Sequence, residues 1–537
     1  MSTPPSPRTV LLRRGEVHSP ADPFATAMVV EAGHVAWVGS EGAADAFADG
    51  VDETVDLDGA LVTPAFTDAH VHTTSTGLAL TGLDLTAARS RAEALTLVRD
   101  HAAARPTDRV LLGHGWDAAR WPDRVPPTRA ELDEATGGRP VYLTRIDVHS
   151  AVVSTALLDL VPGVTDRAGY DPEGPLTRDA HHAVRAAALA AVGPQQRTEA
   201  QRAALRHAAS LGIGSVHECG GPDISSEDDF TGLLDLARSE PGPRVAGYWA
   251  DRDIERVRSL GALGAAGDLF VDGSLGSHTA CLHEPYADTA HTGTAYLTTD
   301  DVAAHVVACT EAGLQAGFHA IGDAACTAVV DGMRAAAEKV GLARVRAARH
   351  RVEHAEMLTP ETVAAFAEFG LTASVQPAFD ALWGGADGMY ADRLGAERAR
   401  TLNPYAALLK AGVPLAFGSD SPVTPLDPWG TIRAAAFHHT PEHRVSVRAA
   451  FTAHTRGGWR AVGRDDAGVL VPGAPADYAV WRTDELIVQA PDDRVARWST
   501  DPRSGTPGLP DLSPGAALPV CLRTVVFGQT VFVRPDE

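Results

Sequence analysis

Lysine, paired cysteine and long apolar runs are all scarce in this 537-residue chain. Its only lysines are Lys339 and Lys410, so arginine supplies almost all of its positive charge. The five cysteines are scattered, odd in number and form no CxxC pair, which argues against a disulfide framework or a thiolate zinc site. No run is apolar enough to span a membrane, and the N-terminus has no apolar signal segment. We therefore expect a cytoplasmic protein that does not associate with membranes.

The charge balance is strongly acidic. The formal net charge is -23 and the sequence pI is about 5.3. Such a surface repels phosphate backbones, so we expect no nucleic-acid partner. Hydrophobic residues make up 45% of the chain, an ordinary globular composition, and the length exceeds that of one typical domain. We expect a large catalytic domain with appended parts.

Both ends of the chain look like short strands separated by turns. Residues 29–39 have a hairpin pattern, and short strand-like segments separated by turns occur again after about residue 465. These patterns predict one β-rich domain built from residues 1–60 and 465–537. The catalytic domain then occupies residues 61–464.

The middle of the chain alternates between apolar strand-like segments and helical segments. Eight strands are predicted, at residues 61–72, 214–219, 244–250, 269–273, 314–320, 349–355, 371–377 and 413–420. Eight βα units indicate an α/β fold of the TIM (β/α)8 barrel type. The first two strands are too far apart for one unit, so residues 84–195 are expected to form an inserted subdomain.

Residues of metal-ligand type fall at the ends of these predicted strands. His70 and His72 are two apart on one strand, so their side chains project to the same side and can hold one divalent metal. His319, His354 and Asp420 end three further strands, and TIM-barrel active sites form at such C-terminal ends. The alternative is that these are core or loop residues with ordinary hydrogen bonds, which leaves their shared position a coincidence.

The order of the motifs resembles the amidohydrolase superfamily, and within it the YtcJ-like (amidohydrolase 3) group. The matching segments are TPAFTDAHVH, GWDAARWP, TRIDVHS, VDGSLGSHTA, FHAIGD, HRVEH, FGSDSPV and GAPADYAV. The resemblance implies a TIM barrel with a β-sandwich made from both termini. It also implies metal ligands at His70, His72, His319, His354 and Asp420.

One departure from the group affects the metal site. Many members carry a carboxylated lysine at the start of the fourth strand, where this chain has Asp268. Asp268 itself could supply a carboxylate, or Glu218 on the second strand could reach in as a bridge. Each also has a simpler reading: Asp268 as a solvated residue, and Glu218 as a group that orients a ligand histidine.

The third outcome, which we favour, is a single zinc without a bridging lysine. His70, His72, His319 and Asp420 would hold it, and His354 would be left either to support the ligands or to serve the substrate. A zinc site lowers the pKa of bound water toward about 7 and polarises a carbonyl group. Asp420 would then accept the proton of the water, and His354 would stabilise the oxyanion.

Other motif residues are candidates for substrate contact. In the inserted segment these are Trp116, Asp117, Trp121, Arg145 and His149, which either form a lid or wall or simply pack the subdomain. The glycine-containing segment from Ser274 to His278 is a candidate pocket loop.

Three functions fit these features. The first is hydrolysis of a C–N bond in a small molecule: an amide, an N-acyl or N-formyl amine, or a cyclic amide. The second is hydrolytic deamination of a heterocycle. The third is a degenerate, non-catalytic member of the family, which the missing lysine favours and the complete ligand set opposes. A homodimer is a reasonable expectation for such a barrel.

Overall fold

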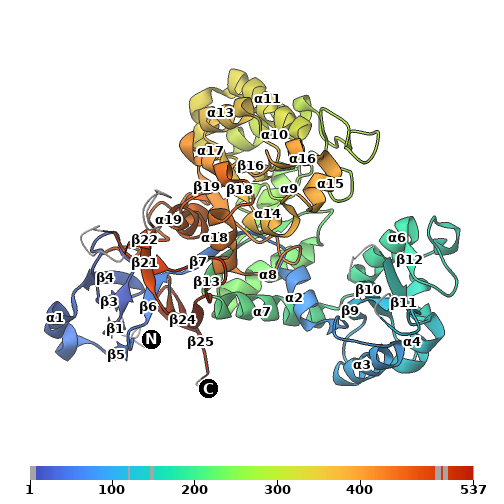
Figure 1. Cartoon of the computed structure of the whole chain (residues 1–537), viewed down its shortest axis with the longest axis horizontal. Helices are drawn as coiled ribbons and strands as arrows, with labels where there is room; N and C mark the ends of the chain where they lie inside the picture. Colours follow the sequence, from blue (N-terminus) through green and yellow to red (C-terminus); the bar gives the residue numbers. More distant parts are fainter. Residues whose placement is uncertain (1–7, 119–120, 146–149, 490–497, 500–505, 536–537) are drawn as a thin grey trace. The chain divides into compact units, whose positions relative to one another are not determined.

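The computed structural model describes residues 8–118, 121–145, 150–489, 498–499 and 506–535. Its central sheet consists of eight parallel strands, several of which are labelled in Figure 1. The order of the strands across the sheet is the same as their order along the chain. The strands are β7 (Phe66–Val71), β13 (Ile213–Gly220), β14 (Arg244–Trp249), β15 (Gly264–Ala265), β16 (Gln315–Ala320), β17 (Arg351–His354), β18 (Thr372–Val375) and β19 (Leu415–Phe417).

The two ends of this sheet meet and nearly close it into a barrel. A parallel bridge joins Val71, at the end of β7, to Ser421, just beyond β19. Two backbone hydrogen bonds support the bridge: Asp420 N–H donates to the His70 carbonyl at 2.8 Å, and His72 N–H donates to the Ser421 carbonyl at 2.9 Å. The predicted TIM barrel is thereby confirmed.

The fourth strand differs from the prediction. It was expected at residues 269–273, but β15 occupies Gly264–Ala265. Gly267 follows with φ of +89°, a left-handed conformation that interrupts the strand pairing. Beyond it, Phe270 forms only an isolated bridge with His319. The irregular stretch after Gly267 places Asp268 at the barrel mouth instead of at the start of a regular strand.

Helices follow most barrel strands (Figure 1). They include α8 (Glu227–Ser239), α9 (Ile254–Ser259), α10 (Thr299–Ala312), α11 (Asp323–Val340), α13 (Pro360–Phe369), α17 (Tyr405–Lys410) and α18 (Pro428–Ala436). The sequence marks their ends locally. The Thr359 side chain accepts a hydrogen bond from Thr362 N–H before α13, Pro360 takes the first position, and Gly370 ends the helix in the left-handed conformation.

Two further sheets are built from the ends of the chain: the first from the N-terminal part alone, the second from both ends. The first consists of β4 (His34–Gly39), β3 (Ala27–Glu31), β1 (Thr9–Arg13) and β5 (Glu53–Asp56). The second consists of β2 (Glu16–Val17), β6 (Leu61–Pro64), β20 (Tyr478–Arg482), β24 (Val520–Val526) and β25 (Gln529–Val533). One apolar cluster contains residues of both sheets, among them Leu12, Met28, Val62 and Val480.

Residues Thr73–Leu205 form a separate compact unit that contains the segment expected as an insertion. Its sheet consists of β12 (Leu176–Thr177), β11 (Ser150–Val153), β10 (Val141–Arg145), β9 (Leu111–Trp116) and β8 (Leu83–Asp84). Tyr142 lies in one apolar cluster, whereas its strand neighbours Val141 and Leu143 lie in another. Because alternate residues of a strand point to opposite faces, this sheet is buried on both sides.

The remaining helices of this unit complete its two cores. They include α2 (Thr73–Thr81), α3 (Arg91–Ala104), α4 (Arg129–Thr136) and α6 (Arg178–Ala190), and α7 (Pro194–Ser210) begins in it. Across all the described ranges, no helix has both the length and the apolar character required to cross a bilayer.

Barrel closure requires that residue 418 has no side chain, and this requirement can be tested. A Cβ atom there would lie 2.5 Å from the backbone nitrogen of His70. Gly418→Ala should therefore lower the free energy of unfolding by about 1–3 kcal/mol through overpacking, seen as a lower Tm. Gly232→Ala is the matched control, because nothing lies within 4 Å of the corresponding Cβ in α8. That change should leave Tm unchanged or raise it. Equal Tm values for both variants would contradict the close contact.

Candidate metal centre

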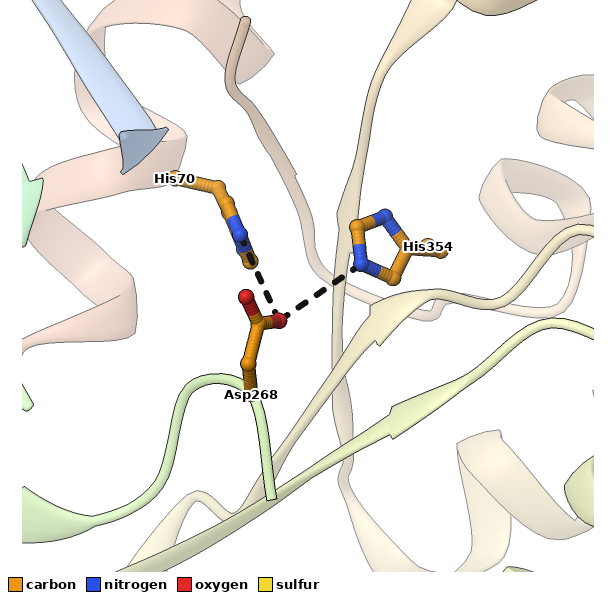
Figure 2. Close-up of side chains that lie close together, drawn as sticks. All are labelled: His70, Asp268 and His354. Carbon is orange, nitrogen blue, oxygen red and sulfur yellow. Dashed lines mark ion pairs between the residues drawn. The ribbon is translucent and has the colours of Figure 1, made fainter. Parts of the chain in front are cut away.

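Residues from four separate segments converge at the C-terminal ends of the barrel strands. His70 and His72 come from the end of β7 and the residue after it, and His354 ends β17. Asp268 follows β15, and Asp420 follows β19. Figure 2 shows His70, Asp268 and His354 directed toward one another from different parts of the chain. The sequence separation of these residues is large, so only the closed barrel brings them together.

The distances between these side chains suit a shared cation. Asp268 and Asp420 each place a carboxylate oxygen 3.2 Å from His72 Nε2, and they lie 3.5 and 3.4 Å from His70 Nε2. His354 Nε2 is 3.7 Å from Asp268. Ligand atoms bound about 2.0–2.2 Å from one tetrahedral ion are roughly 3.3–3.6 Å apart. The observed separations are close to that range and lie at or beyond the long end of ordinary N–H···O hydrogen bonds.

Three buried atoms in this cluster have unmet bonding capacity. His70 Nε2, His72 Nδ1 and Asp268 Oδ1 have no hydrogen-bond partner among the residues that the structure describes. Buried polar groups normally find partners, and buried carboxylates need a nearby positive charge. Imidazole nitrogens and carboxylate oxygens are also the donors that zinc and similar divalent ions accept. The donor set therefore fits a metal ion.

The titration of the cluster reflects the same demand for positive charge. Burial lowers the pKa of the His72 imidazole, but hydrogen bonds with Asp268 and Asp420 outweigh it and raise that pKa well above its ordinary value. Burial also raises the pKa of the Asp268 carboxyl, yet the charge of His70 and hydrogen bonds from the histidines hold it well below its usual range. The Asp268 carboxylate thus remains ionised and requires an imidazolium proton or a metal cation beside it.

His354 is oriented by a neighbouring amide. Its Nδ1 lies 2.9 Å from Gln376 Oε1, while Gln376 Nε2 faces the Ser374 carbonyl at 3.5 Å. With its oxygen turned to the ring, Gln376 accepts from His354 Nδ1–H. In the neutral form of His354, the Nε2 lone pair then faces Asp268 and the cluster. Burial lowers the pKa of this imidazole, but Asp268 and Asp420 outweigh burial and raise it above the ordinary value.

The structure brings together part of the expected ligand set. Clusters of possible ligand atoms within 4.8 Å of one another join His70 and His72 with Asp420, and His70 with Asp268 and His354. Among the described residues, no such cluster includes His319 or Glu218. Asp268 is buried at the centre of the site, so the reading of it as a solvated residue is wrong.

His319 lies beside the cluster, with Asp272 near its Nδ1. Its ring centroid is 4.4 Å from that of His354, and its Nδ1 is 3.6 Å from Asp272. Asp272 accepts backbone hydrogen bonds from Ile321 and Gly322. This arrangement packs His319 against a ligand candidate. Its buried Nδ1 has no hydrogen-bond partner among the described residues, because 3.6 Å is too long for a hydrogen bond with Asp272.

The candidate substrate residues of the inserted segment have contacts within their own unit. Trp116 Nε1 donates to the Leu143 carbonyl at 2.9 Å, and Trp121 Nε1 donates to Ala88 at 2.9 Å. Both indoles are buried. These contacts account for the two tryptophans by packing of the subdomain.

The polar members of that segment are also engaged locally. Arg145 forms an ion pair with Asp117 at 3.1 Å. His149 lies outside the described residues. In the loop after β15, Ser274 contacts Ser277 through their hydroxyls at 3.2 Å, and His278 Nε2 is 2.9 Å from Asp288. A substrate role for all of these residues stays a prediction.

Sequence reasoning missed several groups that contact the site. Glu353 and Arg351 lie on β17 and are fully buried. Cys219, on β13, forms a cluster with His70 and Glu353. Burial raises the pKa of the Cys219 thiol, so it stays protonated at neutral pH. The available signal was two charged residues in alternate positions of a strand predicted to be buried.

Known proteins match this chain over most of its length. A family model described as "Amidohydrolase family" matches residues 53–532. Protein LONG AFTER FAR-RED 3 of Arabidopsis thaliana is 30% identical, covering 86% of this chain and 84% of that protein. The putative amidohydrolase YtcJ of Bacillus subtilis (strain 168) is 27% identical, covering 81% of this chain and 86% of that protein. An N-substituted formamide deformylase of Arthrobacter pascens is 25% identical, covering 86% and 91%.

A solved structure agrees with the fold described above. The crystal structure of an uncharacterized metal-dependent hydrolase from Pyrococcus furiosus superposes with a TM-score of 0.76 at 28% identity. The match covers 89% of this chain and 99% of that chain. The likeness therefore extends over most of both chains.

The geometry distinguishes between Asp268 and Glu218, the two carboxylates that could replace the bridging lysine. Asp268→Asn should weaken zinc binding at least about tenfold, or roughly 1.4 kcal/mol, because it removes a charge that faces both ligand histidines. Glu218→Gln should retain most of the zinc affinity. Both affinities can be measured by competition with a chelator on purified protein. Loss of zinc binding in Glu218→Gln with wild-type affinity in Asp268→Asn would reverse the assignment.

Proposed function

The chain belongs to the amidohydrolase family, as its motifs predict, and on that premise we propose that it hydrolyses a C–N bond of a small molecule with the help of one zinc ion. The substrate class is an amide, an N-formyl or N-acyl amine, or a cyclic amide. The observation that carries the proposal is the buried cluster of His70, His72, Asp268, His354 and Asp420. The similarity to an N-substituted formamide deformylase favours this bond type.

One ion, not two, is the stoichiometry that we propose. Both clusters of ligand atoms use Nε2 of His70, which lies 3.5 Å from Asp268 and 3.4 Å from Asp420. A neutral imidazole nitrogen has one lone pair, so both clusters belong to one site. The two lysines of the chain cannot supply a carboxylated bridge, because Lys339 in the last turn of α11 and Lys410 at the end of α17 are exposed, whereas the cluster is buried. His70, His72, Asp268 and Asp420 would hold the ion, with His354 next to them.

A divalent ion at this position would polarise the scissile carbonyl and lower the pKa of a nearby water. The protein groups then determine where protons go. Asp420 accepts the proton of the attacking water and passes it to the leaving nitrogen, so the amine departs neutral. Its position for this role is fixed by the backbone hydrogen bond from Asp420 N–H to His70.

His354 supports the metal site in this proposal. With Nδ1–H donated to Gln376, the neutral ring has only a lone pair at Nε2. The role of oxyanion donor would require a doubly protonated ring. We therefore assign His354 as a further ligand candidate facing Asp268.

The reaction class can be tested with the zinc-loaded and chelator-treated protein. A panel of N-formyl amines, N-acyl amines, cyclic amides and amino-substituted heterocycles is assayed for released amine, carboxylate and ammonia. We expect zinc-dependent release of amine and carboxylate from members of the first two groups, or ring opening of cyclic amides. Zinc-dependent ammonia release from heterocycles alone would identify a deaminase, and no turnover with bound zinc would favour a non-catalytic member.

Replacement of the proposed proton acceptor should stop turnover without unfolding the protein. Asp420→Asn removes the basic carboxylate, and a loss of general-base catalysis typically reduces the rate by about 100-fold to 10,000-fold. Tm of the variant should stay close to that of the wild type. Asp427→Asn is the matched control: Asp427 caps α18, and asparagine caps a helix equally well. A fully active Asp420→Asn variant would remove Asp420 from the mechanism.

A further inference from the structure

Two fully buried charges lie inside the barrel next to His70. Arg351 and Glu353 occupy alternate positions of β17, so both side chains point to the same side. Arg351 donates from Nε to Glu353 Oε1 at 2.5 Å and from Nη2 to Oε2 at 2.9 Å. This is the two-point geometry in which an arginine and a carboxylate bind most strongly.

The arginine is held from several directions. Its Nη2 also donates to the Ala69 carbonyl at 2.6 Å and to the Ser374 hydroxyl at 2.9 Å. Its Nη1 lies 3.3 Å from His217 Nδ1, and the guanidinium stacks 4.4 Å from the ring centre of Tyr248. The contacts to Ala69, Ser374 and His217 fix the guanidinium to β7, β18 and β13.

A buried ion pair of this kind contributes little net stability to a protein core. Removing two charges from water costs several kcal/mol per ion, and apolar residues of similar volume often give equal or greater stability. Arg351 and Glu353 must therefore supply something that apolar side chains cannot. The one contact of the pair that reaches the metal cluster is Glu353 Oε2, 2.8 Å from His70 Nδ1.

This contact determines which nitrogen of His70 can bind a metal. An ionised carboxylate has no proton to donate, so His70 must carry its proton on Nδ1 and donate it to Glu353. The Nε2 lone pair then faces the oxygens of Asp268 and Asp420, 3.5 and 3.4 Å away. Because Arg351 occupies both oxygens of Glu353, the cluster of His70, Cys219 and Glu353 is a hydrogen-bonded support and not a second ligand set.

We propose that Glu353, locked by Arg351, is a positioning residue that holds His70 in the tautomer and orientation required for metal binding. The inference rests on the metal site of the proposed function. Outer partners of ligand histidines commonly contribute about 10-fold to 100-fold in metal affinity. The Arg351–Glu353 pair is thus retained for the metal and not for the stability of the core.

The decisive variant is the double substitution Arg351→Met with Glu353→Leu. It removes the pair without leaving an unpaired charge, so Tm of the metal-free protein should stay near the wild-type value or rise. Zinc affinity, measured by chelator competition, should fall about 10-fold to 100-fold. Glu353→Gln is the second variant: its amide can turn an N–H toward His70 and displace the proton from Nδ1, so it should also lose zinc affinity.

A partly buried pair elsewhere provides the control. Asp477 is buried, accepts a hydrogen bond from Phe527 N–H at 2.6 Å and forms an ion pair with Arg244 at 3.4 Å. Asp477→Asn should lower Tm and leave zinc affinity unchanged, which separates loss of stability from loss of positioning.

The outcomes distinguish failure of this inference from failure of the proposed function on which it rests. Wild-type zinc affinity in a folded double variant or in Glu353→Gln overturns the positioning role while leaving the metal site intact. Failure of the wild-type protein to bind zinc overturns the metal site, and the positioning role with it. Weaker zinc binding in Glu353→Gln, with Asp477→Asn unaffected, supports the inference even if the double variant does not fold.

Discussion

Closure of the barrel between β19 and β7 is the contact on which the site depends. Asp420 N–H donates to the His70 carbonyl at 2.8 Å, so the segment after the last strand is fixed beside the end of the first. Gly418 permits this approach, because any side chain there would collide with the His70 backbone. The same contact that completes the sheet therefore brings His70, His72 and Asp420 into one cluster.

The charges within the cluster explain how it could hold a metal ion without a carboxylated lysine. Asp268 enters the barrel mouth because Gly267 interrupts the short fourth strand just before it. Two carboxylates then face His70 and His72 in a buried space, and such an arrangement is stable only with added positive charge. A metal ion would supply that charge and also the chemistry of a hydrolase, so the demands of folding and of catalysis would coincide at one point.

The barrel interior divides into two polar layers with different tasks. At the mouth, His70, His72, Asp268 and Asp420 present donor atoms to a common centre. Deeper along β17, Arg351 and Glu353 pair with each other, and Glu353 also contacts His70 Nδ1. A ligand residue positioned by buried neighbours keeps its geometry without contact with solvent, which suits a site that must select one nitrogen of an imidazole ring.

Sequence alone determined the family, the barrel and the firmest ligand candidates, because each follows from a local pattern. Alternation of strand and helix predicts the barrel, the spacing of His70 and His72 places both on one side of a strand, and the short lysine list excludes a carboxylated bridge. Only the tertiary structure decided how the other candidates divide. Asp268 reaches the centre, while Glu218 and His319 belong to no ligand cluster among the described residues. The roles of Glu353 and Arg351 were equally hidden, since distances between strands far apart in sequence depend on how the barrel closes and packs.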